Sequence, residues 1–157
     1  MTRVFSLLAV SALVIACGSS QPATIAGTTI PDTPENQAIV DRVEEYRMAM
    51  ERQDAQALVL MAAESYREQA QAVGDDYGYD GLLDILRHRL RQVEDVRYSL
   101  DYKSIRHEGE RAHVEVLIDA SYTIEDARGE EVRRDMQDQN EFILEWSGER
   151  WMFVSGM

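Results

Sequence analysis

Two side chains in this sequence could take part in acid–base chemistry, the carboxyl of Asp138 and the phenol of Tyr46. Phe142, Leu144 and Trp146 would share one face of a strand predicted over 132–146, and counting back from Phe142 in steps of two places Asp138 on that side. A carboxyl inside an apolar pocket has a raised pKa, because desolvation penalises its charged form, and it can then act as a general acid or base. Tyr46 could add a hydrogen-bond donor. Asp138 and Tyr46 are therefore the catalytic candidates, although no third polar partner is identifiable.

The alternative is that Asp138 does not enter a pocket. A β-bulge near Gln137 would turn its side chain to the opposite face, and a position near a frayed strand end beside Arg134 would leave it in water. The aromatic residues predicted for the inner face of the sheet then form the core of the domain, or line a pocket. They are Tyr98, Tyr102, Phe142 and Trp146.

Metal and phosphate chemistry has weaker support. His113 and Glu115 would share one strand face, a geometry that can bind a metal, but the chain has only three scattered histidines and one cysteine. The acidic stretch 74–81 lacks the regular spacing and the final glutamate of a calcium loop, so we interpret it as a loop followed by a helix N-cap at Asp80. The sequence contains no glycine-rich phosphate loop and no nucleophile elbow. We therefore expect neither a metal nor a cofactor.

Helices are predicted ahead of the strands that would carry these residues. Thr33-Pro34-Glu35 is typical of a helix start, and one apolar stripe follows it as far as a corner near Gln53. That stripe consists of Ile39, Val43, Tyr46 and Met50. Asp54 can cap a second helix, and a third helix with leucines at helical spacing follows Asp80.

The hydrophobic period changes to two after Asp95, which predicts strands. They run from Val96 past Tyr102, then over 111–125, 132–146 and 151–153, with turns between them. A two-residue loop at Gly148-Glu149 would place Trp146 opposite Trp151 and Leu144 opposite Phe153. The pattern predicts an α+β domain in which the N-terminal helices pack on a curved four-stranded antiparallel sheet.

With this order of elements, ending in Gly-Glu-Arg-Trp-Met-Phe at 148–153, the region 34–157 resembles the nuclear transport factor 2-like superfamily. The resemblance implies a cone-shaped roll whose first helix and concave sheet face enclose a pocket. A cystatin-like helix and sheet is the alternative, which the three helices disfavour. Some members of the superfamily are isomerases, cyclases or hydrolases and others only bind, so the fold does not decide the activity. Tyr46 and Asp138 resemble two parts of an isomerase site, and pairing through the sheet implies a possible homodimer.

Residues 1–16 resemble a secretory signal peptide, with Arg3 at the start and an apolar run from Val4 to Ala16. This run is too short to span a bilayer, which takes about 20 apolar residues. The sequence Val-Ile-Ala-Cys at 14–17 resembles the lipobox of bacterial lipoproteins, which implies cleavage before Cys17 and lipid attachment to its thiol. An ordinary signal peptide with an incidental cysteine is the alternative. Residues 17–33 are small and almost uncharged, which predicts a flexible tether.

The mature chain would be one domain with a strongly negative charge. Loss of Arg3 with the signal leaves 15 basic and 29 acidic residues, a net charge of −14. This charge argues against nucleic acid and against direct adhesion to an anionic membrane, so the lipid on Cys17 would provide the membrane attachment. Gly18 after the cysteine implies, by resemblance, the outer membrane facing the periplasm in a Gram-negative cell. We therefore expect the protein in the cell envelope.

The sequence favours a membrane-anchored envelope lipoprotein that acts as a non-catalytic binding or assembly module for a protein partner or a small apolar ligand. The alternative is a small-pocket enzyme of the isomerase, cyclase or hydrolase type that uses Asp138 and Tyr46. A purely structural envelope protein is a third possibility. A buried Asp138 beside an open cavity would favour the enzyme, whereas a filled cone would favour the other two.

Overall fold

The computed structural model describes residues 23–68 and 77–157. The predicted signal peptide, Cys17 and residues 74–76 of the acidic stretch lie outside these residues. Within the described ranges, no helix is both long enough and apolar enough to cross a bilayer.

Three helices form within the described residues, and capping side chains mark the start of the first two. They are α1 (Pro34–Glu51), α2 (Ala55–Met61) and α3 (Tyr79–Leu90). The Thr33 hydroxyl accepts from the Asn36 backbone N–H, and the Asp54 carboxylate accepts from that of Ala57, as expected of N-caps. The predicted cap at Asp80 is wrong. Helix α3 begins at Tyr79, because Gly78 ends a short extended strand and passes directly into the helix, which places Asp80 in the first turn.

The sheet is antiparallel, in the order β3-β4-β5-β6. Its strands are β3 (Glu94–Glu108), β4 (Arg111–Glu125), β5 (Glu131–Trp146) and β6 (Trp151–Ser155), and a separate two-stranded sheet pairs β1 (Arg67–Glu68) with β2 (Tyr77–Gly78). The predicted pairs Trp146 with Trp151 and Leu144 with Phe153 are confirmed. The predicted α+β class, with N-terminal helices on a curved four-stranded antiparallel sheet, is confirmed as well.

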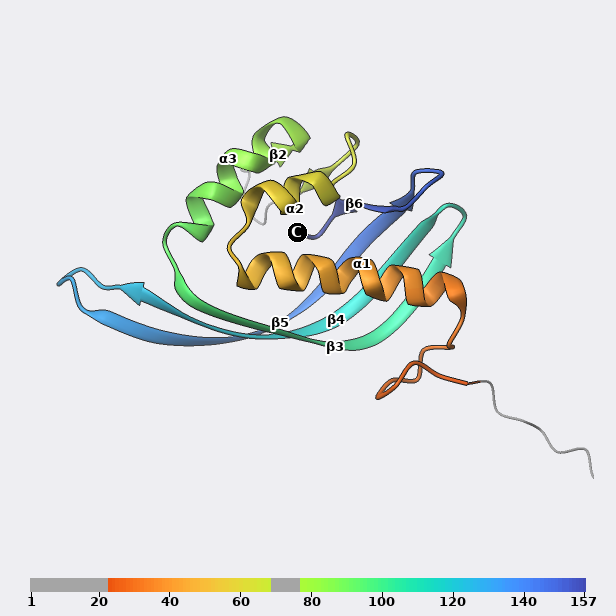
Figure 1. Ribbon diagram of the computed structural model, residues 1–157, viewed down its shortest axis with the longest axis horizontal. Helices are drawn as coiled ribbons and strands as arrows, with labels where there is room; N and C mark the ends of the chain where they lie inside the picture. The colour runs from red at the N-terminus through yellow and green to blue at the C-terminus, as the bar shows by residue number, and fades with distance from the viewer. Residues whose placement is uncertain (1–22, 69–76) are drawn as a thin grey trace, which may run out of the picture.

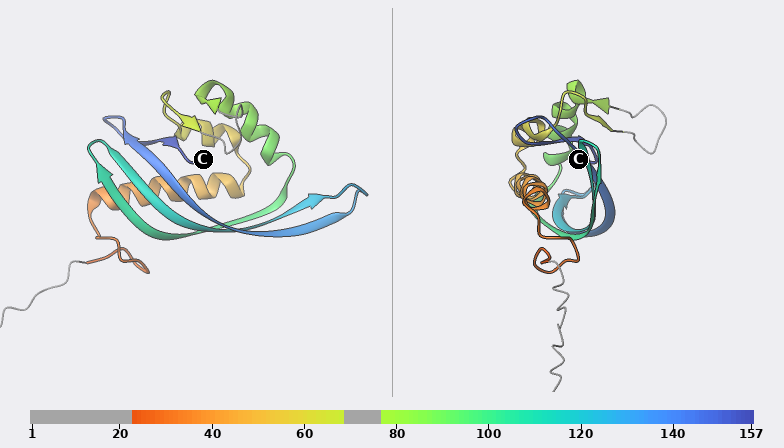
Figure 2. Two further views of the ribbon diagram at one scale, coloured as in Figure 1. Left: turned by 180° about the vertical axis from the view of Figure 1, so that it is seen from behind. Right: turned by 90° about the vertical axis from the view of Figure 1, so that its right-hand side faces the viewer.

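The sheet curves around the helices. Helix α1 lies along its concave face, with α2 and α3 beside it, while the distal parts of β4 and β5 extend past the helices (Figures 1 and 2). The opposite end of the sheet carries the β3–β4 and β5–β6 turns and lies beside the start of α1. The fold therefore has a covered half and an open half on the same concave face.

The core of the covered half is aromatic. Phe142 and Phe153 meet edge to face with ring centroids 5.6 Å apart, and Tyr46 of α1 packs on both, at 5.0 and 5.5 Å. Both phenylalanines are fully buried and Tyr46 is 3% exposed. Edge-to-face rings of this kind add about 0.5–1.5 kcal/mol per pair beyond the area they bury. The predicted stripe of α1 supplies the helical side of this core, with Ile39 and Val43 fully buried.

Residues 23–33, predicted to belong to the tether, form a closed loop. Thr24 and Pro31 pair in a bridge, and the Ile25 N–H donates to the Ile30 carbonyl at 2.9 Å. Ile30 is 3% exposed. The folded part of the chain therefore begins ahead of residue 34, because Ile30 supplies an apolar anchor that the small, uncharged composition of the segment obscured.

Candidate functional site

Asp138 lies on the concave side of the sheet, as the alternation predicts. The pairing of β4 with β5 is unbroken from Arg111↔Glu145 to Glu125↔Glu131 and sets Asp138 opposite Ile118, so the alternative of a bulge at Gln137 is wrong. The carboxyl nevertheless stays exposed to solvent, although its partner Ile118 is only 5% exposed. Asp138 thus shares a face with the core but is not enclosed by it.

Tyr98, and not Tyr46, is the phenol that the charge of Asp138 affects. Burial raises the pKa of Tyr98 above its ordinary value, hydrogen bonding with Tyr46 opposes this shift, and the negative charge of Asp138 adds to it. Tyr46 itself is deeper, and burial followed by the influence of Tyr98 raises its pKa well above the ordinary value. The rings of Tyr46 and Tyr98 are edge to face at 6.1 Å. Both phenols therefore stay protonated and can act as donors at neutral pH.

The interior of the cone is occupied by the chain's own residues. Fully buried Tyr66 donates from its hydroxyl to the Glu68 carboxylate at 2.6 Å and accepts from the Met157 N–H at 3.1 Å. Glu68 also accepts from the Gly156 N–H, and the Asn140 amide donates to the Gly156 carbonyl, both at 2.8 Å. The last residues consequently lie between the helices and the sheet, where Figure 1 places the end of the chain.

The remaining predicted aromatic residues lie apart from one another. Phe142 is in the core, whereas Tyr102 is half-buried and donates to the Glu44 carboxylate of α1 at 2.9 Å. Trp146 is 40% exposed at the end of β5. A single box of Tyr98, Tyr102 and Trp146 does not form, because the three positions are spread along the length of the sheet.

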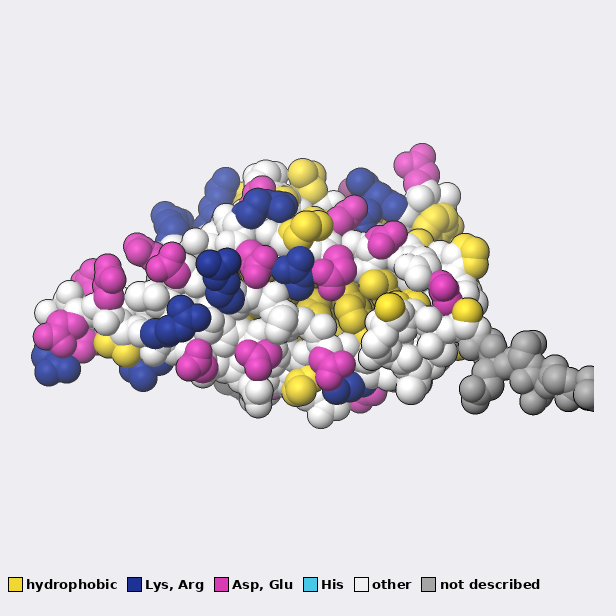
Figure 3. Space-filling view, turned by 60° about the horizontal axis from the view of Figure 1, so that its bottom comes forward, with side chains coloured by type: hydrophobic (Ala, Val, Ile, Leu, Met, Phe, Trp, Pro, Cys, Tyr) yellow, Lys and Arg dark blue, Asp and Glu magenta, His cyan; other side chains and the backbone are white. Residues whose placement is uncertain are grey.

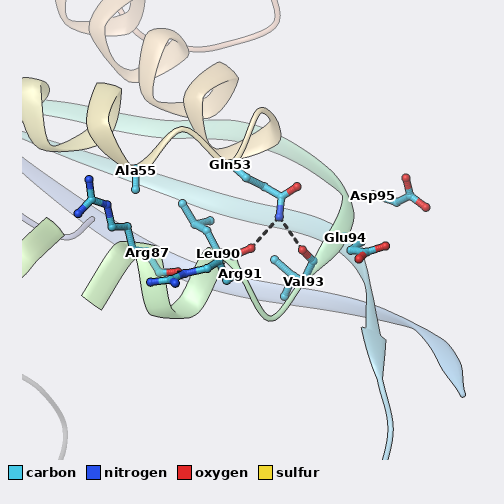
Figure 4. Close-up of a pocket in the computed structure, with 8 residues that line it drawn as sticks. All are labelled: Gln53, Ala55, Arg87, Leu90, Arg91, Val93, Glu94 and Asp95. Atoms are coloured by element: carbon cyan, nitrogen blue, oxygen red, sulfur yellow. Dashed lines mark hydrogen bonds between the residues drawn. The ribbon is translucent and has the colours of Figure 1, made fainter. Parts of the chain in front are cut away.

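A polar groove opens at the corner between α1 and α2. It has a volume of about 860 Å³ and lies between this corner, the end of α3 and the start of β3 (Figure 4). The lining residues are Gln53, Ala55, Arg87, Leu90, Arg91, Val93, Glu94 and Asp95. The Gln53 amide donates to the carbonyls of Leu90 at 2.7 Å and Val93 at 2.5 Å, as the dashed lines in Figure 4 mark. These bonds hold the α1–α2 corner against the end of α3, so Gln53 has a structural role. Acidic and basic side chains both line the groove, so it favours no one class of charged ligand.

A smaller pocket at the opposite end of the domain is built around the two tryptophans. It has a volume of about 330 Å³, and its lining residues are Glu35, Ala38, Gly109, Glu110, Trp146 and Trp151. We refer to these six residues as the tryptophan pocket. The two indoles meet edge to face at 5.6 Å and 62°, and Trp151 is 4% exposed. A concave site with an apolar wall and few polar groups is the usual form of a small-ligand site.

Hydrogen bonds of a buried asparagine, Asn36, hold the frame of the tryptophan pocket in place. Asn36 is 5% exposed, and its amide donates to the Pro31 carbonyl while its oxygen accepts from His107 Nε2, both at 2.8 Å. His107 packs against Trp151 with ring centroids 6.4 Å apart, and its Nδ1 lies 3.5 Å from a Glu35 carboxylate oxygen. The start of α1, strand β3 and the tryptophan pair are thereby fixed relative to one another.

Sequence reasoning paired Trp146 with Trp151 but did not identify the pocket. The turn at Gly148-Glu149 located both indoles, while the contribution of Glu35 and Ala38 depends on how α1 packs against the sheet, which no local pattern reports.

The face of the described residues shown in Figure 3 carries no patch of a single charge, because acidic and basic side chains are interspersed over it. Within residues 23–68 and 77–157, no three histidine, cysteine or acidic side chains are placed to hold a metal ion.

Comparison of the sequence with protein-family models and with curated proteins finds no match. Solved structures do match the fold. A candidate scytalone dehydratase from Novosphingobium aromaticivorans superposes with a TM-score of 0.67 at 14% identity, over 78% of this chain and 80% of that one. A candidate dehydratase of the nuclear transport factor 2-like family from Streptomyces avermitilis gives 0.65 at 14%, over 79% and 95%. A conserved protein from Planctomyces limnophilus gives 0.63 at 13%, over 78% and 92%.

These likenesses establish a nuclear transport factor 2-like fold. At such low identity they concern the fold alone, and proteins of one fold carry out unrelated functions. The function has to be argued from the side chains of this chain.

Proposed function

We propose that this protein is a lipid-anchored lipoprotein of the cell envelope whose domain is a non-catalytic binding module, with the tryptophan pocket as its binding site. The observation that carries the proposal is the pairing of a 40%-exposed Trp146 with a buried Trp151 in a concave site of about 330 Å³. A large aromatic side chain left open beside a fixed aromatic wall offers apolar contact area that folding has not used.

The anchor rests on the lipobox-like sequence that ends at Cys17. Because the folded loop starts at residue 23, only residues 18–22 connect it to the cysteine, a span of about 17 Å at full extension. The loop 23–33, the start of α1 and the tryptophan pocket lie at the same end of the domain (Figure 1). In the anchored protein, the pocket would then be held close to the membrane that carries the lipid.

Binding can be read directly from the protein's fluorescence, because both of its tryptophans line the pocket. We expect 3,3-dimethylbutan-1-ol, a small neutral apolar alcohol, to change the emission in a saturable way. The control is the Trp146→Leu variant, in which Trp151 remains as the reporter but one wall is lost. A linear, non-saturating response in the wild type would contradict the proposed binding site.

A second candidate function is proton transfer on the concave face. The observation that favours it is a juxtaposition: Tyr98 pairs with Ala120 and Asp138 with Ile118, so the two side chains flank β4 on the same face, and the charge of Asp138 adds to the raised pKa of Tyr98. Asp138 would remove a proton next to a carbonyl, and Tyr98 would donate a hydrogen bond to the oxygen that becomes negative. Binding is the better supported role, because Tyr98 is only 7% exposed and the aromatic core fills the space beneath it.

The proton-transfer candidate can be tested without knowing a substrate. A ketone such as cyclohexanone exchanges its α-hydrogens in deuterated buffer, and NMR follows the exchange. An enzyme would accelerate it, and Asp138→Asn would remove the acceleration while Asp119→Asn, on the outer face of β4, would not. No acceleration by the wild-type chain would argue against this candidate for simple ketones.

A further inference from the structure

We propose that the tryptophan pocket recognises an organic cation, a quaternary ammonium group with small alkyl substituents. This inference rests on the proposed function and narrows it, since it names the ligand class of the same site. Its support comes from three separate features of the pocket: the aromatic walls, the charge of the residues that line it, and the rigidity of its frame.

The walls of the pocket are two indoles, and indole is the side chain with the strongest attraction for cations. Trp146 and Trp151 meet edge to face at 62° and form a corner, in which the 40%-exposed Trp146 supplies the indole face that a ligand can reach and the 4%-exposed Trp151 supports it. A trimethylammonium group has an apolar surface and a spread positive charge, and it suits such a corner better than a strongly hydrated primary ammonium does. An uncharged alkyl group would make the apolar contacts but gain no attraction from the ring faces.

The charge of the lining is uniformly negative. Glu35 and Glu110 are the two charged residues among the six that line the pocket. The arginines next to this lining in the chain pair with other carboxylates, Arg42 with Glu45 at 2.6 Å and Arg111 with Glu145 at 3.0 Å. His107 Nδ1 lies 3.5 Å from Glu35, which leaves Glu110 as the carboxylate of the lining without a basic neighbour among these residues. Two carboxylates at an aromatic corner favour a positive ligand and oppose a negative one. The overall net charge of −13 also raises the local concentration of cations.

The frame of the pocket is set before any ligand arrives. Trp151 is 4% exposed and is held between Trp146 and His107, and His107 is in turn bonded to the buried Asn36. The pocket also draws residues from three parts of the fold: the first turns of α1, the β3–β4 turn, and the paired ends of β5 and β6. A site fixed in this way loses little conformational entropy when a ligand binds.

The test compares choline with 3,3-dimethylbutan-1-ol, its neutral analogue of the same shape, at constant ionic strength. The full chain is kept in a nonionic detergent, and tryptophan emission is the readout. We expect choline to bind about tenfold more tightly than the neutral analogue, which corresponds to about 1.4 kcal/mol and lies within the range of cation–π attraction. Trp146→Leu should abolish this difference, and Trp146→Phe, which keeps an aromatic face, should preserve part of it.

The charge contribution is tested with a matched pair of double variants. Glu35→Gln with Glu110→Gln should weaken choline binding several-fold and leave binding of the neutral analogue unchanged. Glu130→Gln with Glu131→Gln removes the same charge at the opposite end of the sheet and should leave both unchanged. Circular dichroism of each variant verifies that it is folded.

The outcomes separate the inference from the proposed function. Equal affinities for choline and the neutral analogue would overturn the cation proposal and leave an apolar binding site. A saturable response to neither compound would overturn both. A trimethylammonium group can also belong to a lipid headgroup, so the Cys17→Ala chain is mixed with phosphatidylcholine or phosphatidylethanolamine vesicles. A selective emission change with phosphatidylcholine assigns the headgroup as the ligand, and a response to free choline alone assigns a small solute.

Discussion

The indole rings of Trp146 and Trp151 meet edge to face with centroids 5.6 Å apart, yet Trp146 is 40% exposed and Trp151 only 4%. The two residues are direct cross-strand partners at the hairpin that joins β5 and β6. Trp151 is therefore part of the core, whereas Trp146 is available to a ligand, so substitutions of the two residues should have different effects.

Trp151→Ala should lower the free energy of unfolding by about 3–5 kcal/mol, because it leaves a cavity beneath Trp146 and His107. Trp146→Ala should cost about 1 kcal/mol, mostly from loss of the ring pair. Urea unfolding followed by circular dichroism measures both. Similar losses for the two variants would show that Trp146 is a structural residue, and would weaken the case for a binding pocket.

Gln53→Ala should lower the free energy of unfolding by about 1–3 kcal/mol, since the carbonyls of Leu90 and Val93 lose their shared donor. Gln53 also has φ of +54°, a conformation that glycine adopts without strain. Gln53→Gly should therefore be less destabilising than Gln53→Ala by about 1 kcal/mol. If alanine were the milder change, the backbone strain would not be relieved and this account of the corner would be wrong.

Gly156→Ala and Gly148→Ala form a matched pair, since both glycines have φ near +95°, at +96° and +93°. A Cβ on Gly156 would lie 2.4 Å from the Glu141 carbonyl oxygen, whereas nothing lies within 4 Å of one on Gly148. We expect Gly156→Ala to be more destabilising by about 1–3 kcal/mol, because backbone atoms cannot move aside as side-chain ends can. Thermal unfolding compares the two, and equal losses would mean that the last residues do not hold their place in the cone.

Alkaline pH should destabilise the domain through its buried phenols. Burial is the main cause that raises the pKa of Tyr46, Tyr66, Tyr98 and Tyr102 above the ordinary value. Below about pH 10, the ordinary tyrosine pKa, both states keep the phenolic protons, so this contribution to stability is complete. Above it the unfolded chain ionises first, so stability falls as pH rises.

The urea midpoint measured between about pH 9 and pH 11 should therefore decrease, and tyrosinate absorbance of these four residues should appear together with unfolding. Tyr46→Phe, which cannot ionise at that position, should show a shallower decrease. An identical slope in the two proteins would show that the Tyr46 phenol does not contribute.

Cys17→Ala should move the protein from the membrane fraction to the soluble fraction of cells that express the full chain, since the hydrocarbon attachment would be lost. Labelled palmitate should be incorporated into the wild-type chain and not into this variant. Ser19→Ala, two residues away in the same segment, should behave like the wild type. Incorporation of labelled palmitate into Cys17→Ala would show that the lipid is attached to another residue, and would refute the lipobox interpretation.

The sequence by itself determined the class of the fold and the register of the last hairpin, because hydrophobic period, capping residues and turn residues are local properties. The two-residue loop at Gly148-Glu149 was enough to pair Trp146 with Trp151 correctly. Counting back from Phe142 in steps of two placed Asp138 on the concave face, where the structure sets it opposite Ile118. The loop at 23–33 was missed, since its single apolar anchor, Ile30, sits among small residues.

Tertiary structure alone decided exposure and proximity. Asp138 and Trp146 lie on the same face as the core, yet Asp138 is exposed and Trp146 is 40% exposed, because the elements packed on that face do not enclose either side chain. Which residues meet around Trp146 likewise depends on the packing of the first turns of α1 near the β3–β4 turn, far away in sequence. Alternation fixes the side of a strand, whereas burial and neighbours are fixed by where the other layer ends.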